Sequence, residues 1–283
     1  MNITNSLKSY IKEALKEDKA ERDITTSGLE ISGLKVKAVI YACQEGMLCG
    51  IDIAKEVFKS LGEIKWISNF KDGMHFRKGE EIAVLEGKAK VILGAERAAI
   101  NILSHLSGIA AFTEKFVNFV ACNKIKIYDT RKTTPLMRKL EKYAVRTGGG
   151  YNHRMDLLNV LMIKDNHISV FRKKYKKDNY IIQMVDILRK KYPDKEMVLE
   201  IHNMGEWIQA VKVKPDVVMF DNWSFEDIRQ ALKMYKKREF EIEISGNISF
   251  KQLDEIMKLG VNRISLGCIT HSAAALNFSL EVC

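Results

Sequence analysis

The chain has 283 residues, of which 46% are hydrophobic and 29% are charged, with 46 Lys and Arg against 36 Asp and Glu. This composition is typical of a folded protein of one or two domains, and with only 3 prolines it argues against widespread disorder. No run of about 18 apolar residues occurs, and the N-terminal segment lacks the apolar core of a secretory signal. We therefore expect a cytoplasmic protein without a membrane span.

The first third of the chain predicts a small α+β unit. Its apolar spacing indicates a helix over residues 4–19, a strand over 35–42, a helix over 50–61, and strands over 64–69 and 81–86. A long helical stretch follows over residues 90–121 and leads into the rest of the chain. Ser107-Gly108 marks a point where this helix could break.

From residue 124 onward, strands and helices alternate. We expect strands over residues 125–128, 160–163, 197–201, 217–220, 242–244 and 263–266. We expect helices between them over residues 135–145, 181–191, 206–212, 225–236 and 250–259. Such alternation favours a parallel sheet, either doubly wound or closed into a barrel. Polar residues follow nearly every strand, which favours the barrel, because barrel active sites are built from the C-terminal ends of several strands.

The net charge of +10 is compatible with binding to a nucleic acid, an acidic membrane surface or a small polyanionic substrate. The densest basic run, residues 171–178, has no periodic apolar partner and indicates a solvated loop or a helix end. Basic residues within 129–138 and 153–167 are instead interleaved with Gly, Thr and His. That setting favours a small anionic ligand.

The segment over residues 129–135 reads Asp-Thr-Arg-Lys-Thr-Thr-Pro, and a helix is predicted to start at Pro135. Proline suits a first helical turn, whose free N–H groups favour anions. Arg131 can bind a carboxylate through two parallel hydrogen bonds, and Lys132 is a compact charge suited to phosphate. We interpret this segment as an anion-binding loop rather than a solvated turn.

Two further segments add cations. The glycines at 148–150 permit close approach of the backbone to a ligand, and His153 and Arg154 follow them. A buried strand ends at Lys164, whose charge can neutralise a phosphate or a carboxylate. For the neighbouring Asp165, a structural salt bridge is an equally open interpretation.

Acidic and small residues complete the predicted rim. Glu200 and Asp221 lie at strand ends, where they can hold Mg²⁺ together with substrate phosphate or can bind ribose hydroxyls, and both roles stay open. Ser245-Gly246-Asn247 and the segment from Gly267 to His271 are either phosphate-binding loops or ordinary strand-to-helix turns. No P-loop, Rossmann glycine motif, HExxH or GxSxG sequence is present. Five scattered cysteines without a CxxC pair argue against a disulfide framework and a zinc site.

Several ordered motifs resemble the quinolinate phosphoribosyltransferase family, also called carboxylating nicotinate-nucleotide pyrophosphorylase. They are TRKTTP at 130–135, EKYAVRTGGGYNHRM at 141–155 and LMIKDNHI at 161–168. The likeness extends to RDITT at 22–26, GAERAAINILSHLSGIA at 94–110, FDNW at 220–223 and SLGCITHSAAALNFSL at 265–280.

The resemblance implies an N-terminal α+β domain over residues 1–110, bridging helix included, and an incomplete C-terminal α/β barrel over residues 111–283. It implies transfer of phosphoribosyl from phosphoribosyl pyrophosphate to quinolinate with decarboxylation, giving nicotinate mononucleotide, CO₂ and pyrophosphate in NAD biosynthesis. It also implies Mg²⁺ as cofactor. The expected assembly is a homodimer with shared active sites, in which the N-terminal region of one subunit covers the barrel mouth of its partner. Assembly beyond the dimer is left open.

The resemblance also implies roles for individual residues. The carboxylates of quinolinate would be bound by Arg131, His153, Arg154, Lys164 and, from the partner copy, Arg97. Pyrophosphate would be neutralised by Lys132 and Lys164, which with Glu200 and Asp221 form the expected catalytic set. Glu200 and Asp221 would hold the ribose hydroxyls and Mg²⁺. The 5′-phosphate would be bound by Ser245, Gly246, Asn247, Gly267 and His271.

Three positions depart from the family pattern: Asn247 replaces a common glycine, Leu136 replaces another, and an acidic residue common near Asn203 is missing. Three other interpretations remain. A related phosphoribosyltransferase or paralogue of the same fold should lack the cations for a second carboxylate, and a barrel with an inactive site should lack the cation set altogether. A nucleic-acid-binding protein should show aromatic residues interleaved with its basic runs, and these are scarce here.

Overall fold

A computed structural model describes residues 3–175, 178–235 and 239–283. The chain forms two compact units. The first unit comprises the residues up to Glu114, Leu140–Gly149 and Ser272–Cys283, and the second comprises Lys115–Lys139 and Gly150–His271. The domain boundary expected between residues 110 and 111 stays a prediction.

The first unit is built on an antiparallel sheet with the strand order β12-β1-β5-β3. Its strands are β1 (Lys35–Ala42), β2 (Gly46–Met47), β3 (Ile64–Ile67), β4 (His75–Phe76), β5 (Glu81–Lys88) and β12 (Phe278–Val282). Its helices are α1 (Asn5–Glu17), α2 (Ile24–Gly28), α3 (Ile51–Leu61), the first part of α4 (Ala89–Val120) and most of α5 (Arg138–Thr147).

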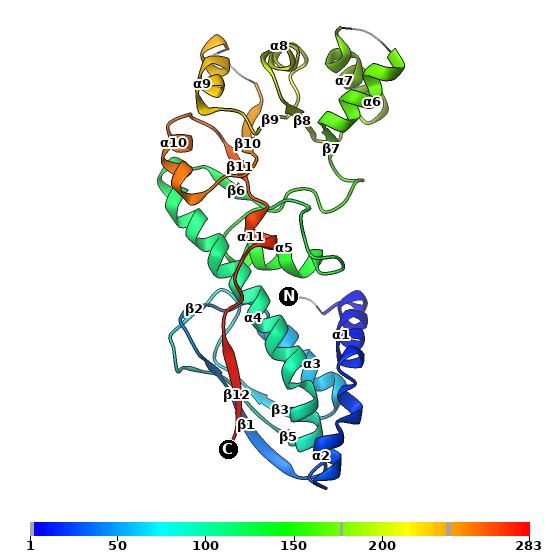
Figure 1. The fold of residues 1–283 in the computed structure, drawn as a ribbon, viewed down its shortest axis with the longest axis vertical. Coiled ribbons are helices and arrows are strands. Elements are labelled where there is room, and N and C mark those ends of the chain that lie inside the picture. The colour runs from blue at the N-terminus through cyan, green and yellow to red at the C-terminus, as the bar shows by residue number, and fades with distance from the viewer. Residues whose placement is uncertain (1–2, 176–177, 236–238) are drawn as a thin grey trace. The chain divides into compact units, whose positions relative to one another are not determined.

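Amphipathic helices close the core of this unit. Helix α1 places Leu7, Ile11 and Leu15 at helical spacing, and all three are buried. The side chain of Thr4 accepts a hydrogen bond from the Leu7 N–H and so caps the start of this helix. Helices α1 and α3 pack against each other (Figure 1).

The second unit is a six-stranded parallel sheet with the order β6-β11-β10-β9-β8-β7. The strands are β6 (Lys126–Tyr128), β7 (Leu161–Ile163), β8 (Met197–Ile201), β9 (Val217–Asp221), β10 (Glu241–Ser245) and β11 (Arg263–Ser265). The helices are α6 (Asp165–Tyr175), α7 (Tyr180–Lys191), α8 (Met204–Val213), α9 (Phe225–Met234), α10 (Leu253–Met257) and α11 (Cys268–His271). Figure 1 shows helices α6 to α10 along the outer side of this sheet.

The strand order is that of an incomplete barrel. Strands β7 to β11 are neighbours in chain order, and β6 pairs with β11, so β6 and β7 form the two edges of the sheet within the described residues. Strand β8 is buried at every position, as expected for a central parallel strand covered on both faces. All carboxyl ends of the strands therefore meet at one end of the unit.

Several predicted elements match the structure, and others do not. Strands 35–42 and 197–201 are observed with the predicted bounds. The predicted helix start at Pro135 is wrong, because α5 begins at Arg138 and residues 135–137 form a turn. Leu136 adopts a φ of 67°, a left-handed conformation that interrupts a right-handed helix.

The break considered at Ser107-Gly108 is also absent, because α4 continues from Ala89 to Val120. Gly108 serves close packing instead, since a Cβ at this position would collide with the backbone carbonyl of Ala274. In the basic run, residues 171–175 end helix α6, and residues 176–177 lie outside the described residues. Within the described part of the chain, no helix is long and apolar enough to cross a membrane.

Candidate active site

A cavity of about 540 Å³ lies at the carboxyl ends of the strands of the second unit. Its lining includes every sequence-predicted site residue except Arg97, namely Arg131, Lys132, His153, Arg154, Lys164, Glu200, Asp221, Ser245, Gly246, Asn247, Gly267 and His271. Arg97 belongs to the first unit, where it is exposed on α4 with its Nη2 3.7 Å from Glu96 Oε1.

A buried aspartate ties two segments of the cavity together. Asp129 follows β6 directly, is fully buried, and accepts a hydrogen bond from the His153 N–H at 2.8 Å. The N–H of Asp129 donates in turn to the Tyr151 carbonyl at 3.0 Å. These contacts hold the segment that carries Arg131 beside the segment that carries Arg154.

Arg131 and Arg154 are both partly buried, and the charge of Arg131 acts on Arg154. Burial, and after it the charge of Arg131, lowers the pKa of Arg154. The Nε of Arg131 is buried and has no hydrogen-bond acceptor among the described residues. Like charges held together with an unused donor indicate a site for an anion, whose binding would relieve both the repulsion and the unsatisfied N–H.

Lys132 belongs to a different part of the cavity wall. A Cβ built on Gly267 would lie 3.0 Å from Lys132 Cδ and 3.1 Å from His271 Nε2, so these three residues converge. The hydroxyl of Thr270 donates to the Lys132 carbonyl at 2.7 Å and fixes the two loops to each other.

The loop after β10 approaches the end of β9 closely. Gly246 has a φ of 97°, and a Cβ there would collide with the side chain of Asn222 and lie 2.8 Å from its backbone N. Asn222 and Asn247 also have positive φ, of 56° and 36°. Asparagine tolerates this conformation better than most residues. Only glycine fits at position 246, which brings the 245–247 backbone to the cavity edge.

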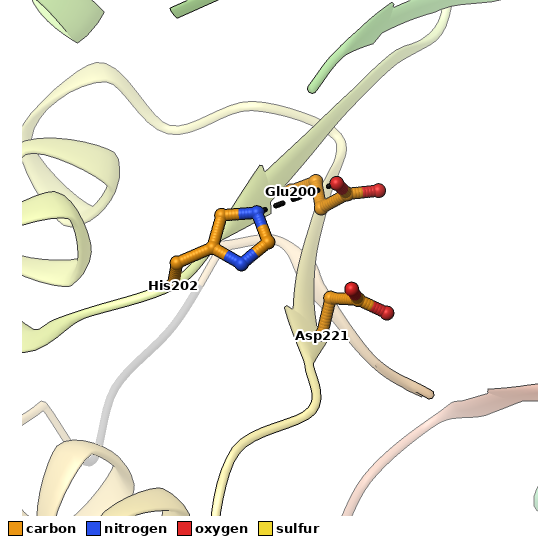
Figure 2. Close-up of side chains that lie close together, drawn as sticks. All are labelled: Glu200, His202 and Asp221. Atoms are coloured by element: carbon orange, nitrogen blue, oxygen red, sulfur yellow. Dashed lines mark ion pairs between the residues drawn. The ribbon is translucent and has the colours of Figure 1, made fainter. Parts of the chain in front are cut away.

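Figure 2 shows an acidic cluster on the neighbouring ends of β8 and β9. One ligand atom from each of Glu200, His202 and Asp221 lies within 4.8 Å of the others. Glu200 is 5% exposed, and its Oε2 lies 3.0 Å from Lys164 Nζ. His202 Nε2 lies 3.4 Å from Glu200 Oε1.

Family comparisons agree with this arrangement. Residues 109–281 match the model of the quinolinate phosphoribosyl transferase C-terminal domain, and residues 23–107 match that of the N-terminal domain. The chain belongs to the quinolinate phosphoribosyltransferase family.

Full-length relatives of this family include a probable nicotinate-nucleotide pyrophosphorylase [carboxylating] from Bacillus subtilis, 38% identical over 98% of this chain and 93% of that protein. A quinolinate phosphoribosyltransferase [decarboxylating] 1b from Nicotiana tabacum is 33% identical over 99% of this chain and 83% of that protein. The nicotinate-nucleotide pyrophosphorylase structure from Ehrlichia chaffeensis superposes with a TM-score of 0.90 at 33% identity over all of both chains. The family membership and two-domain fold predicted from the sequence are confirmed.

Two residues that contact cavity residues were given no role in the sequence analysis. His202 lies two positions after Glu200, and residues two apart in a strand point to the same face, so the signal was available. Glu243 was not detectable in the same way, because it lies within the predicted strand 242–244. It is fully buried beneath the cavity, with its Oε1 3.5 Å from His153 Nε2 and bonded to the Ser265 hydroxyl.

His153 contacts protein groups through both ring nitrogens. The Arg154 N–H donates to His153 Nδ1 at 2.9 Å, so a neutral ring carries its hydrogen on Nε2, which faces Glu243. A direct hydrogen bond from His153 to a substrate carboxylate would require Nε2 to leave Glu243. The predicted role of His153 in binding quinolinate stays a prediction.

Two further polar side chains near the cavity are poorly suited to catalysis. Burial raises the pKa of the Cys268 thiol, so this cavity residue stays protonated near neutral pH and is a poor nucleophile. His167 Nδ1 accepts a hydrogen bond from the Lys164 N–H at 3.1 Å, so one of its ring nitrogens is engaged by the backbone.

Proposed function

We propose that this chain transfers the phosphoribosyl group of phosphoribosyl pyrophosphate to quinolinate and releases nicotinate mononucleotide, CO₂ and pyrophosphate for NAD biosynthesis. The observation that carries the proposal is that one cavity is lined by four cations and two acids, namely Arg131, Lys132, Arg154, Lys164, Glu200 and Asp221. Quinolinate and phosphoribosyl pyrophosphate are both polyanions, and this cation set is matched to them. The full-length family match supports the same reaction.

The chemistry needs positioned charge rather than a nucleophilic side chain. The ring nitrogen of quinolinate bonds to C1 of the ribose while the C1–O bond breaks and pyrophosphate leaves with the electron pair. The ring nitrogen is then cationic, and its charge stabilises the electron pair that stays on the adjacent carbon when the carboxylate there departs as CO₂. That electron pair then takes up a proton. Lys132 and Lys164 stabilise the charge that gathers on the leaving pyrophosphate.

Substrate carboxylates are assigned to Arg131, Arg154, Lys164 and His153, with Arg97 contributed by the partner copy of a cytoplasmic homodimer. The 5′-phosphate is assigned to the loop 245–247 together with Gly267 and His271. Lys164 contacts Glu200 at 3.0 Å, so substrate binding would make it exchange this carboxylate for a substrate anion.

Glu200 and Asp221 fit a Mg²⁺ ion that arrives with phosphoribosyl pyrophosphate, since Mg²⁺ binds proteins through one or two carboxylates and takes further ligands from substrate phosphates. When bound, Mg²⁺ would supply charge neutralisation for the leaving pyrophosphate. The same carboxylates can also accept hydrogen bonds from the ribose hydroxyls.

The first test is a steady-state assay of the purified protein with phosphoribosyl pyrophosphate, Mg²⁺ and either quinolinate or nicotinate, following nicotinate mononucleotide and CO₂. Turnover of quinolinate alone is expected, because nicotinate lacks the second carboxylate. Turnover of neither substrate would refute the proposal and favour a paralogue with another anionic heterocycle. Arg154→Ala should abolish quinolinate binding while the circular dichroism spectrum stays unchanged. Normal quinolinate binding by this variant would refute the role of Arg154.

The shared site is tested by mixing two inactive variants. Arg97→Ala and Arg154→Ala remove residues that the proposal places on different subunits of one site. After joint unfolding and refolding, mixed dimers should contain one intact site and recover activity that neither variant shows alone. Absence of recovered activity, with mixed dimers demonstrated by native mass spectrometry, would place both arginines in the same subunit's site.

A further inference from the structure

The imidazole of His202 stands beside the two carboxylates at the ends of β8 and β9 (Figure 2). Glu200 and His202 share one face because they are two positions apart at the end of a strand, and Asp221 ends the neighbouring strand. Parallel register places Glu200 opposite Met219 and Ile201 opposite Phe220. Strand pairing therefore brings Glu200 and Asp221 together, and His202 follows directly after the last residue of β8.

The geometry of this cluster suits a single ion. Metal–ligand bonds of about 2.0–2.2 Å allow two ligands of one ion to lie up to about 4.4 Å apart. The ligand atoms of Glu200, His202 and Asp221 lie within 4.8 Å of one another, so small side-chain rotations would bring all three into range. Lys164 Nζ contacts Glu200 Oε2, and the other carboxylate oxygen, Oε1, faces His202.

The donor chemistry of the cluster differs from that of a pure carboxylate site. Mg²⁺ is a hard ion that takes oxygen ligands, whereas imidazole nitrogen suits first-row transition ions. We propose that His202 joins Glu200 and Asp221 as a third protein ligand, and that this site binds a divalent first-row transition ion in preference to Mg²⁺, with Mn²⁺ as the probe ion. The inference rests on the proposed function only in assigning this ion to the phosphoribosyl pyrophosphate site.

A simpler role for His202 is to hold Glu200 in place. An imidazole that only donates to Glu200 Oε1 would leave a bound ion without a nitrogen ligand. An imidazole that binds the ion must direct a lone pair at it and cannot donate through that same nitrogen. The two roles therefore differ in whether nitrogen is bonded directly to the metal, and a spectroscopic measurement can distinguish them.

The test uses the full-length protein without a histidine tag, stripped with a chelator and titrated with Mn²⁺. Binding is followed by electron paramagnetic resonance as loss of the free-ion signal, and pulsed measurements on the bound ion detect directly bonded ¹⁴N. We expect ¹⁴N coupling in the wild-type protein and its loss in His202→Gln. Loss of an outer-shell partner typically lowers metal affinity about 10–100-fold. Loss of a direct ligand in His202→Gln should lower the Mn²⁺ affinity by at least this much.

Two other variants complete the experiment. His75→Gln is the matched control, because His75 also faces a glutamate, with Nε2 2.9 Å from Glu114 Oε1 in the first unit, and its loss should leave Mn²⁺ binding unchanged. His202→Asp restores an oxygen ligand and should reduce the preference for Mn²⁺ over Mg²⁺ in competition titrations. It also provides a second test if His202→Gln does not fold.

Absence of ¹⁴N coupling in the wild-type protein, or coupling that persists in His202→Gln, would overturn the inference. Both readouts are made without substrates, so they are independent of the reaction. A protein that converts quinolinate but shows no nitrogen-bonded Mn²⁺ would retain the proposed function and lose this inference. A protein with nitrogen-bonded Mn²⁺ and no quinolinate turnover would retain this inference and lose the proposed function.

Discussion

Replacement of Gly246 by alanine tests how the cavity edge is built. A non-glycine residue in the left-handed region costs about 1–2 kcal/mol. The new methyl group also meets the side chain and the backbone N of Asn222, and forcing an extra methyl into a packed site typically adds about 1–3 kcal/mol. Gly246→Ala should therefore lower the free energy of unfolding by about 2–5 kcal/mol.

Gly260 provides the matched control for the backbone contribution. It also has a positive φ, of 67°, but no heavy atom lies within 4 Å of a Cβ built on it. Gly260→Ala should cost only the conformational part, about 1–2 kcal/mol. The difference between the two variants, about 1–3 kcal/mol, isolates the collision with Asn222 and is measured by urea unfolding.

The same substitution should impair ligand binding, because Asn222 is the neighbour of Asp221 in the acidic cluster. We expect the dissociation constant for phosphoribosyl pyrophosphate, measured by calorimetry, to rise about tenfold or more in Gly246→Ala, which corresponds to about 1.4 kcal/mol. Gly260→Ala should bind normally. Equal stability losses in the two variants, or unchanged ligand binding in Gly246→Ala, would refute the reasoning.

Three further predictions concern titration and packing. At about pH 8, iodoacetamide should modify exposed Cys122 well before Cys268, because burial raises the pKa of the Cys268 thiol, as followed by mass spectrometry. Burial, then the hydrogen bond to Asp72, raises the pKa of Tyr143 above its ordinary value of 10.0. The stability that Tyr143 contributes is therefore complete below about pH 10 and is lost as pH rises further, and Tyr143→Phe should flatten that loss in urea unfolding. Trp207 is fully buried, and its indole N–H has no acceptor among the described residues, so Trp207→Phe removes no hydrogen bond and keeps most of the ring volume. Trp207→Phe should therefore lower the free energy of unfolding by less than the about 3–5 kcal/mol expected for Trp207→Ala.

Each of these predictions has a clear contrary result. Equal alkylation rates at Cys122 and Cys268 would show that the Cys268 thiol is not suppressed by burial. An unchanged alkaline stability profile in Tyr143→Phe would assign the loss to other groups. Equal costs for the two Trp207 variants would show that ring volume contributes nothing at that position.

Local sequence patterns were sufficient for much of the fold. The strands Lys35–Ala42 and Met197–Ile201 were predicted with their observed bounds, because side-chain alternation and short apolar runs record burial directly. The cations and acids of the cavity were also identified, because parallel strands place the residues after their carboxyl ends at one edge. The helix start at Pro135 was missed because the left-handed turn at Leu136 depends on its surroundings.

The sequence by itself therefore determined the alternation of strands and helices in the second unit, the cations and acids that line the cavity, and the family. Only the tertiary structure decided which distant residues meet. Strand β12 was not predicted, and it forms through pairing with β1, which is more than 200 residues away in the chain. The buried contact between His153 and Glu243 and the approach of His202 to Asp221 depend likewise on strand register. Pairing between strands that are far apart in the chain is settled by burial across the whole sheet, and the spacing within one strand does not identify its partner strand.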